Sequence, residues 1–156
     1  ATGIQIGVRT HHANQIATAV AYETAISNVD ANALASLAKN TSGAMGDLAL
    51  FQAYMLDKDV AKLEMLASDG DTPDFRDLAK LHVVGIRGND MTAAQVEKYL
   101  SDLNTKKSPF YYTAALTVAQ KYLAEGDVVH ANKWLDKIIN DADAPSVISG
   151  TAQSLR

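Results

Sequence analysis

The prolines of this 156-residue chain recur at a fixed interval of 36 residues, at Pro73, Pro109 and Pro145. Proline is tolerated in the first turn of a helix and disrupts a helix interior, so each proline marks a place where a helix can begin. Thr72 and Ser108 precede two of them as plausible N-caps, whereas Ala144 offers no capping side chain. An alanine-rich apolar stretch with helical spacing follows each proline. Helix starts that repeat with a period in the thirties predict stacked helical hairpins.

The composition narrows the class of function. At 156 residues the chain is expected to fold as one domain with a real core. Its net charge is −4, and its adjacent basic pair, Lys106-Lys107, lies in a predicted loop. No positive patch is therefore available to neutralise phosphates. The absence of cysteine excludes disulfides, thiolate catalysis and cysteine-based zinc sites. We expect no nucleic-acid partner, no metal and no cofactor.

The sequence also constrains any relation to a membrane. The most apolar stretch, residues 16–26, is interrupted by Thr18, Glu23 and Thr24 and is shorter than the ~20 residues that span a bilayer. The chain begins at Ala1 without a signal-peptide pattern. The lack of cysteine fits a reducing cytosol and a periplasmic domain without disulfides equally well. We expect membrane attachment only through a transmembrane helix outside this chain.

Apolar residues at helical intervals predict an all-α fold of about nine helices, and no useful alternating strand pattern occurs. Asp30, Thr92 and Asp127 are expected to cap helices that begin one residue later, and Thr41 or Ser42 to cap one that begins at Gly43. The prediction is a single helical-repeat domain, 1–156, whose first helix lies within residues 12–27. Its elements are four antiparallel hairpins and a capping helix, at about 8–39, 42–68, 73–103, 109–141 and 145–155.

The last hairpin carries small and aromatic residues at defined spacings. Ala119 and Ala131 fall where the two helices of a hairpin cross, and a larger side chain there would hold them apart. Tyr122 fills the space between neighbouring hairpins, Gly126 allows the tight turn, and Leu135 completes the pattern. The chain therefore resembles a tetratricopeptide-like solenoid, a fold that implies binding to other proteins.

Several short segments, together with the Ala-rich first hairpin, carry a second resemblance: Asp77-Leu78-Ala79-Lys80-Leu81, Ala124-Glu125-Gly126-Asp127, Ala144-Pro145 and Leu155-Arg156. Through them most of the chain resembles a narrower family, the YfgM-like tetratricopeptide domains of Gram-negative bacteria. The resemblance implies a periplasmic domain held at the inner membrane by one N-terminal transmembrane helix. It also implies an accessory role beside the Sec translocon and periplasmic chaperones, without enzymatic activity.

The register of the repeat places a candidate groove on the first helices of the last two hairpins. The groove-facing residues are expected to be Phe75, Leu78, His82, Thr113, Leu116 and Gln120. None is Lys or Arg, so the carboxylate clamp for which the tetratricopeptide family is known is not expected. A mixed apolar and polar groove suits an amphipathic or extended segment of a partner. Residues that could anchor a partner at the rim are Tyr111, Tyr112 and Arg76, and at least one of the trio Phe110-Tyr111-Tyr112 should be exposed.

Other kinds of chemistry find little support in the sequence. The four histidines lack the spacing of a helical zinc site, and neither a phosphate-binding glycine loop nor a nucleophile elbow occurs. The aspartate pairs are expected to cap helices or to lie in turns, at Asp57/Asp59, Asp69/Asp71 and Asp141/Asp143. We expect a non-catalytic interaction module. The alternatives are a self-associating structural module that forms a homodimer, and a hydrolase or metal-binding domain that uses His82 and His130.

Overall fold

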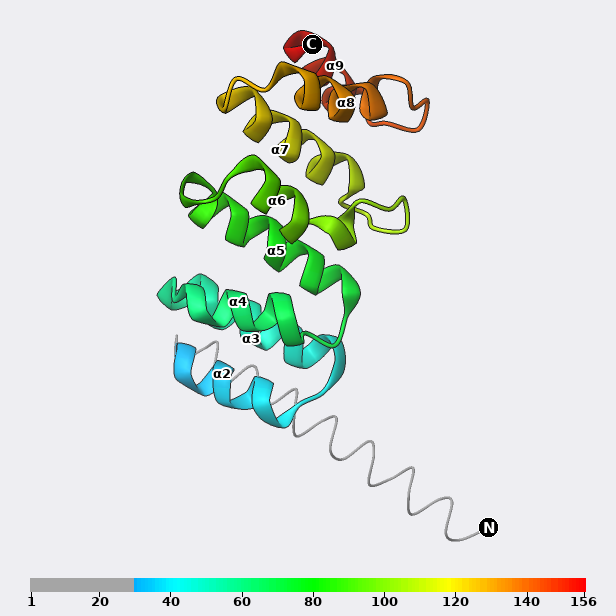
Figure 1. The fold of residues 1–156 in the computed structure, drawn as a ribbon. Coiled ribbons are helices and arrows are strands. Elements are labelled where there is room, and N and C mark those ends of the chain that lie inside the picture. Colours follow the sequence, from blue (N-terminus) through cyan, green and yellow to red (C-terminus); the bar gives the residue numbers. More distant parts are fainter. Residues whose placement is uncertain (1–29) are drawn as a thin grey trace, which may run out of the picture. The chain divides into compact units, whose positions relative to one another are not determined.

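The computed structural model describes residues 30–156, which contain helices and no strand (Figure 1). This confirms the all-α prediction for that part of the chain. The α-helices are α2 (Ala31–Asn40), α3 (Gly43–Asp57), α4 (Val60–Asp69), α5 (Pro73–Arg87), α6 (Ala93–Tyr99), α7 (Tyr111–Ala124), α8 (Val128–Ile139) and α9 (Ser146–Leu155). Two short 3-10 helices, η1 (Gly88–Asp90) and η2 (Ser101–Leu103), follow α5 and α6. The predicted helix in residues 12–27 lies outside the described residues.

Two compact units make up the described chain. The first unit, residues 30–76, contains α2, α3, α4 and the first turn of α5. Here α2 and α4 each pack against α3. The fully enclosed side chains are few and lie mostly at helix contacts: Leu34, Ala49, Ala53, Leu63 and Leu66. Whether the whole chain is one domain, as the sequence predicts, stays a prediction.

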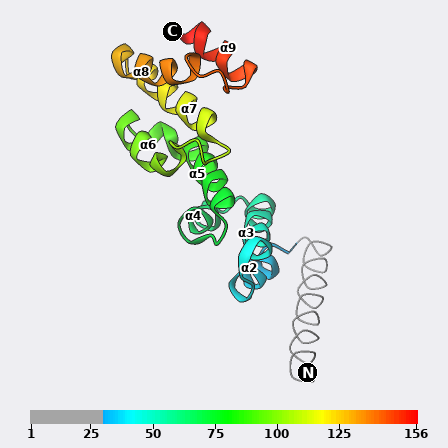
Figure 2. The same cartoon turned by 90° about the vertical axis from the view of Figure 1, so that its right-hand side faces the viewer.

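The second unit, Asp77–Arg156, has the larger core. Its helices α7 and α8 form a closely packed pair, with α6 on α7 and α9 on α8 (Figure 2). The core draws buried residues from α5, α6, η2, α7, α8 and α9, among them Val84, Val96, Leu103, Val118, Leu135 and Ala152. No helix among residues 30–156 is long and apolar enough to cross a membrane.

Most predicted helix starts are confirmed by their capping contacts. Asp30 accepts hydrogen bonds from the backbone N–H groups of Asn32 and Ala33 at the start of α2. Thr92 forms a capping box with Gln95 at the start of α6, and Asp127 accepts from the backbone N–H of His130 in α8. These side chains satisfy backbone donors that have no partner within the helix.

The proline positions need a correction. Pro73 is the first residue of α5, but Pro145 lies just before α9, and Pro109 lies in a turn two residues before α7. Ser108 does not cap α7 as expected, because its Oγ accepts from the N–H of Phe110 and the helix begins only at Tyr111. The prolines therefore mark approaches to helices, and only one occupies a first helical position.

Two other predicted boundaries also differ. The helix expected to run from residue 93 to 103 ends at Tyr99, and η2 follows it. Ser42 is the N-cap residue of α3, but its side chain makes no capping hydrogen bond. The carboxylate of Asp71, 28 residues away, accepts from the N–H of Gly43 instead, at 2.6 Å. A distant residue thus performs the capping that the local sequence predicts for Thr41 or Ser42.

Candidate functional site

Within the second unit, α5 and α7 run in the same direction and are joined near both ends. Near their N-terminal ends, Ser108 Oγ donates to Asp77 Oδ2 at 2.9 Å, and both side chains are buried. Near their C-terminal ends, Lys121 Nζ donates to the backbone oxygen of Gly88 at 2.6 Å. Because each contact joins equivalent ends, the two helices must lie parallel.

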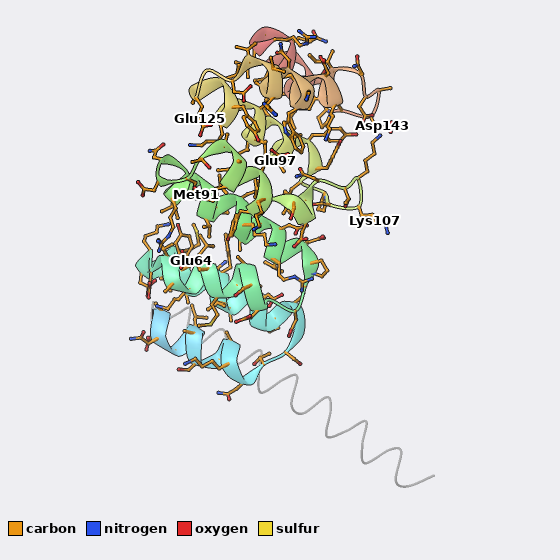
Figure 3. All side chains as sticks on the ribbon, in the orientation of Figure 1. Glu64, Met91, Glu97, Lys107, Glu125 and Asp143 are labelled. Atoms are coloured by element: carbon orange, nitrogen blue, oxygen red, sulfur yellow. The ribbon has the colours of Figure 1, made fainter. Side chains whose placement is uncertain are left out.

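α6 runs antiparallel to α7 and is joined to it at the C-terminal part of α7. The backbone N–H of Ala93, the first residue of α6, donates to Glu125 Oε1 at 2.6 Å. One turn further along α6 lies Glu97, which is labelled in Figure 3. It accepts a hydrogen bond from the hydroxyl of the buried Tyr122. This hydrogen bond, together with burial, raises the pKa of Tyr122 to about 12. The hydroxyl therefore stays protonated, and keeps its hydrogen bond, to a higher pH than that of an ordinary tyrosine.

The α7–α8 pair places its small residues where close helix approach needs them. Ala119 and Ala131 are both fully buried, and so is Leu135. Gly126, in the turn between the helices, has a φ of +80°, a conformation that L side chains rarely adopt. The burial and the turn conformation expected for these four residues are confirmed.

The candidate groove residues form one narrow strip on each of two helices. On α5, Leu78 is half-buried and His82 is exposed; we call these two residues the α5 strip. On α7, Leu116 is half-buried between the exposed Thr113 and Gln120, and these three form the α7 strip. Spacings of three and four residues keep each strip on one helix face. Both strips thus combine one half-buried leucine with exposed polar side chains.

The remaining groove candidate and one rim candidate lie in the first unit. Phe75 is half-buried in the first turn of α5. Arg76 is also half-buried, and its Nη1 donates to the backbone oxygen of Gly70 at 2.5 Å. Because Gly70 is the residue that ends α4, the guanidinium satisfies a carbonyl at a helix end. Arg76 therefore has a structural contact of its own.

The aromatic rim candidates are also engaged within the protein. Phe110, Tyr111 and Tyr112 are all half-buried, so the expectation that one of them is exposed is wrong. Each has a contact that covers part of it: Phe110, just before α7, packs against the core, and the rings of Tyr111 and Tyr112 meet edge to face, 5.0 Å apart. The Tyr112 hydroxyl donates to Asp141 Oδ2 at 2.9 Å. Tyr112 thus links the two ends of the α7–α8 pair.

Asp141 is at the centre of a cluster that includes Tyr112, Lys106 and the backbone N–H of Asp143. Its Oδ2 also lies 2.8 Å from Lys106 Nζ, while its Oδ1 accepts from the N–H of Asp143. The Lys106 ammonium and these hydrogen bonds hold the pKa of Asp141 below its usual range. Burial and the neighbouring carboxylate raise the pKa of Tyr112. The cluster ties the loop before α7 to the loop after α8, and every group in it already has a partner.

Within residues 30–156, the histidines and aspartates lie in separate contacts and form no metal-binding group. His130 Nδ1 lies 2.7 Å from Asp127 Oδ2, and its ring stacks on that of Tyr122 at 5.2 Å. The exposed His82 lies on α5. Across residues 30–156, no three His, Asp or Glu side chains are grouped so that they could hold a metal ion. Asp59, Asp71 and Asp141 accept backbone N–H groups, which confirms that the aspartate pairs contribute caps and turns.

Sequence reasoning missed a groove in the first unit. It has a volume of about 790 Å³ and is lined by α2, α3, α4 and the loops that join and follow them. We call it the first-unit groove, and its most informative lining residues are Lys39, Leu50, Asp59, Lys62, Met65 and Asp69. The signal that would have pointed to it is charge: residues 30–76 carry eight acidic and four basic side chains, whereas Asp77–Arg156 carries nine of each. Only the first unit is acidic.

One wall of the first-unit groove is fixed by a buried carboxylate. Asp47, on α3, is 6% exposed, and its two oxygens accept from the backbone N–H groups of Asp71 and Thr72 at 3.0 and 2.7 Å. Asp71 in turn caps α3 through Gly43. Gly46 lies one residue before Asp47, and a Cβ there would come within 2.1 Å of the backbone oxygen of Thr41. The reciprocal pair Asp47 and Asp71, the Asp47–Asp71 clasp, holds the loop after α4 against α3.

Comparison with known proteins adds no relative. No family model, no curated protein and no solved structure matches this chain. The resemblance to tetratricopeptide repeats and to the YfgM-like family therefore stays a prediction, and function must be argued from the geometry of the described residues.

Proposed function

We propose that this chain is a non-catalytic protein-interaction module built from tetratricopeptide-like hairpins. The observation that carries the proposal is the parallel arrangement of α5 and α7, joined through Asp77–Ser108 and Gly88–Lys121, with α6 antiparallel to α7. Stacked hairpins bring equivalent helices into this order. Repeat proteins of this kind use the surface lined by equivalent helices to bind partners.

The α5 and α7 strips are the proposed contact surface. Leu78 and Leu116 offer apolar area, and His82, Thr113 and Gln120 offer hydrogen-bonding groups. Neither strip contains a charged side chain, apart from a histidine in its protonated form. Such a surface favours the apolar face of an amphipathic segment and a modest affinity, because little area is fully desolvated.

The test compares variants of the α7 strip with a variant elsewhere on the second unit. A partner captured by the full chain would be identified, purified and titrated calorimetrically against Leu116→Ala, Gln120→Ala and Gln153→Ala. Gln153 is exposed on α9, outside both strips, and serves as the matched control. We expect the two α7 variants to weaken binding severalfold and the control to bind normally. Unchanged binding by correctly folded Leu116→Ala and Gln120→Ala would show that the strips are not the contact surface.

The cellular location and the identity of the partners rest on the family resemblance alone. By that resemblance, we propose that the module acts on the periplasmic side of a bacterial inner membrane, beside the Sec translocon or a periplasmic chaperone. Fractionation of cells that produce the natural protein, followed by crosslinking, tests both points. Recovery in the cytoplasm, without crosslinks to translocon or chaperone, would reject this assignment and leave the interaction role in place.

Self-association is the second candidate function. Three valines of the second unit are more than half exposed: Val128 and Val129 on α8 and Val147 on α9. Exposed β-branched residues at helix starts are a plausible contact for another copy of the chain. Sedimentation over a range of concentrations separates the two functions, since a dimer that Val129→Lys dissociates would favour self-association.

A further inference from the structure

The first-unit groove has an apolar floor and a charged edge. Leu50, from α3, is half-buried in it, and Met65, from α4, is 43% exposed. Asp59 and Asp69 stand at opposite ends of α4 and also line the groove. At about 790 Å³ it is large enough for several side chains. The flexible thioether side chain of Met65 can adapt to side chains of different shape.

The electrostatics of the groove favour a cation. Lys62 is paired with Asp57 and lies 3.8 Å from Asp59, so its ammonium is compensated and in turn offsets part of the charge of Asp59. Asp69 is the last residue of α4, where the helix dipole adds its own negative end to the carboxylate. With eight acidic and four basic residues, the first unit has a net charge of −4, which equals the net charge of the entire chain. A positively charged partner would be attracted to this unit over several ångströms.

We propose that the first-unit groove binds a basic amphipathic segment of a partner protein. Its apolar side chains would pack on Leu50 and Met65, and its Lys or Arg side chains would face Asp59 and Asp69. Charge complementarity selects this occupant over another copy of the chain, since two acidic units repel each other, and over nucleic acid. The inference rests on the proposed interaction role but assigns a second surface, distinct from the α5 and α7 strips.

The probe is a fluorescein-labelled 12-residue peptide of Lys, Leu and Ala arranged as an amphipathic helix. A second peptide with Glu in place of every Lys is its control. Fluorescence anisotropy is measured with the full chain at low and high salt. We expect the basic peptide to bind, with an affinity that falls as salt rises, and the acidic peptide to give no signal. Equal binding of both peptides, or binding of neither, would overturn the proposal.

Charge variants locate the site. Asp69→Lys should weaken binding about threefold to tenfold, because it reverses one edge charge. It also replaces an acid by a base at a helix C-terminus, which favours folding. Lys39→Glu, at the groove edge contributed by α2, should strengthen binding by a similar factor. Asp90→Lys, an identical charge change at an exposed residue of η1 in the second unit, is the matched control and should have little effect.

The outcomes separate the two proposals. If Asp69→Lys and Asp90→Lys weaken binding of the basic peptide equally, the attraction comes from the overall charge of the chain and the groove assignment fails. In that case the interaction role, which is tested through Leu116 and Gln120 with a natural partner, is unaffected. If the α7 variants abolish natural partner binding while Asp69→Lys alone weakens the peptide, both surfaces stand.

Discussion

The two units of this chain hold short helices together by different means. In the first unit, Leu34 is the single buried residue of α2, and the loop after α4 is fixed by the Asp47–Asp71 clasp. In the second unit, buried side chains from six helical elements meet in one core, and hydrogen bonds such as Tyr122–Glu97 lie at its edges. The first unit carries all of the net charge and an open groove; the second is neutral. We infer that the smaller core leaves more of the stability of the first unit to polar contacts.

The largest expected effect tests the two cores directly. Leu135→Ala in the second unit should lower the free energy of unfolding by about 3–5 kcal/mol, because the surrounding core cannot collapse into the cavity. Leu34→Ala in the first unit should cost about 2–3 kcal/mol, because α2 can shift to fill the space. Urea unfolding followed by circular dichroism measures both. If Leu34→Ala costs more than Leu135→Ala, the first unit is not the more weakly packed one.

The buried aspartates provide the next comparison. Asp47→Ala removes the acceptor for two backbone N–H groups and should cost about 2–3 kcal/mol. Asp77→Ala removes one hydrogen bond from the Ser108 hydroxyl and should cost about 1 kcal/mol. The same urea experiment applies, with Ser108→Ala as the control for the second pair. A smaller loss for Asp47→Ala than for Asp77→Ala would mean that the clasp does not support the first unit.

The third prediction concerns the hydrogen bond between Tyr122 and Glu97. Tyr122→Phe should cost about 1.5 kcal/mol at neutral pH, and Tyr111→Phe is the matched control. The pKa of Tyr122 in the folded protein is about 12, above the unfolded value near 10. The contribution of this hydrogen bond to the free energy of unfolding is therefore complete below pH ~10 and is lost as the pH rises through about 12. Denaturation of wild type and Tyr122→Phe at increasing alkaline pH measures this loss, and parallel curves would contradict it.

The smallest effects are expected at the turns. Gly126 in the second unit and Lys58 in the first both have positive φ, at +80° and +57°. Gly126→Ala should cost about 1 kcal/mol through backbone strain alone, since no atom lies near the added Cβ. Lys58→Gly should relieve similar strain and stabilise the first unit by up to about 1 kcal/mol, less the lost contact of its ammonium with the Tyr54 ring. Thermal denaturation detects both shifts, and changes of the same sign would refute the comparison.

Local chemistry made most helix boundaries predictable. Asp30, Thr92 and Asp127 cap the helices expected of them, because an N-cap side chain acts within three residues of itself. The burial of Ala119 and Ala131 could also be predicted, because close helix crossings admit only small side chains. The prolines predicted helix starts less reliably than the capping residues did. Pro109 lies in a turn, and the residue before it, Ser108, donates to Asp77, 31 residues earlier in the chain.

The features that sequence reasoning missed depend on contacts beyond a single helix and its cap. Asp71 caps α3 from another loop, Arg76 donates to the carbonyl of Gly70 at the end of the preceding helix, and Tyr112 donates to Asp141. No local pattern announces such pairs. The first-unit groove could have been suspected from the uneven distribution of charge, but its walls are visible only when α2, α3 and α4 are placed together.

The Asp47–Asp71 clasp has a consequence for hydrogen exchange. The amides of Asp71 and Thr72 belong to a loop, and loop amides normally exchange quickly with deuterated solvent. Here both are held by the buried carboxylate of Asp47 on α3. Their hydrogens should therefore exchange at the rate at which α3 opens, so that two loop amides report on the opening of a helix more than twenty residues earlier in the chain.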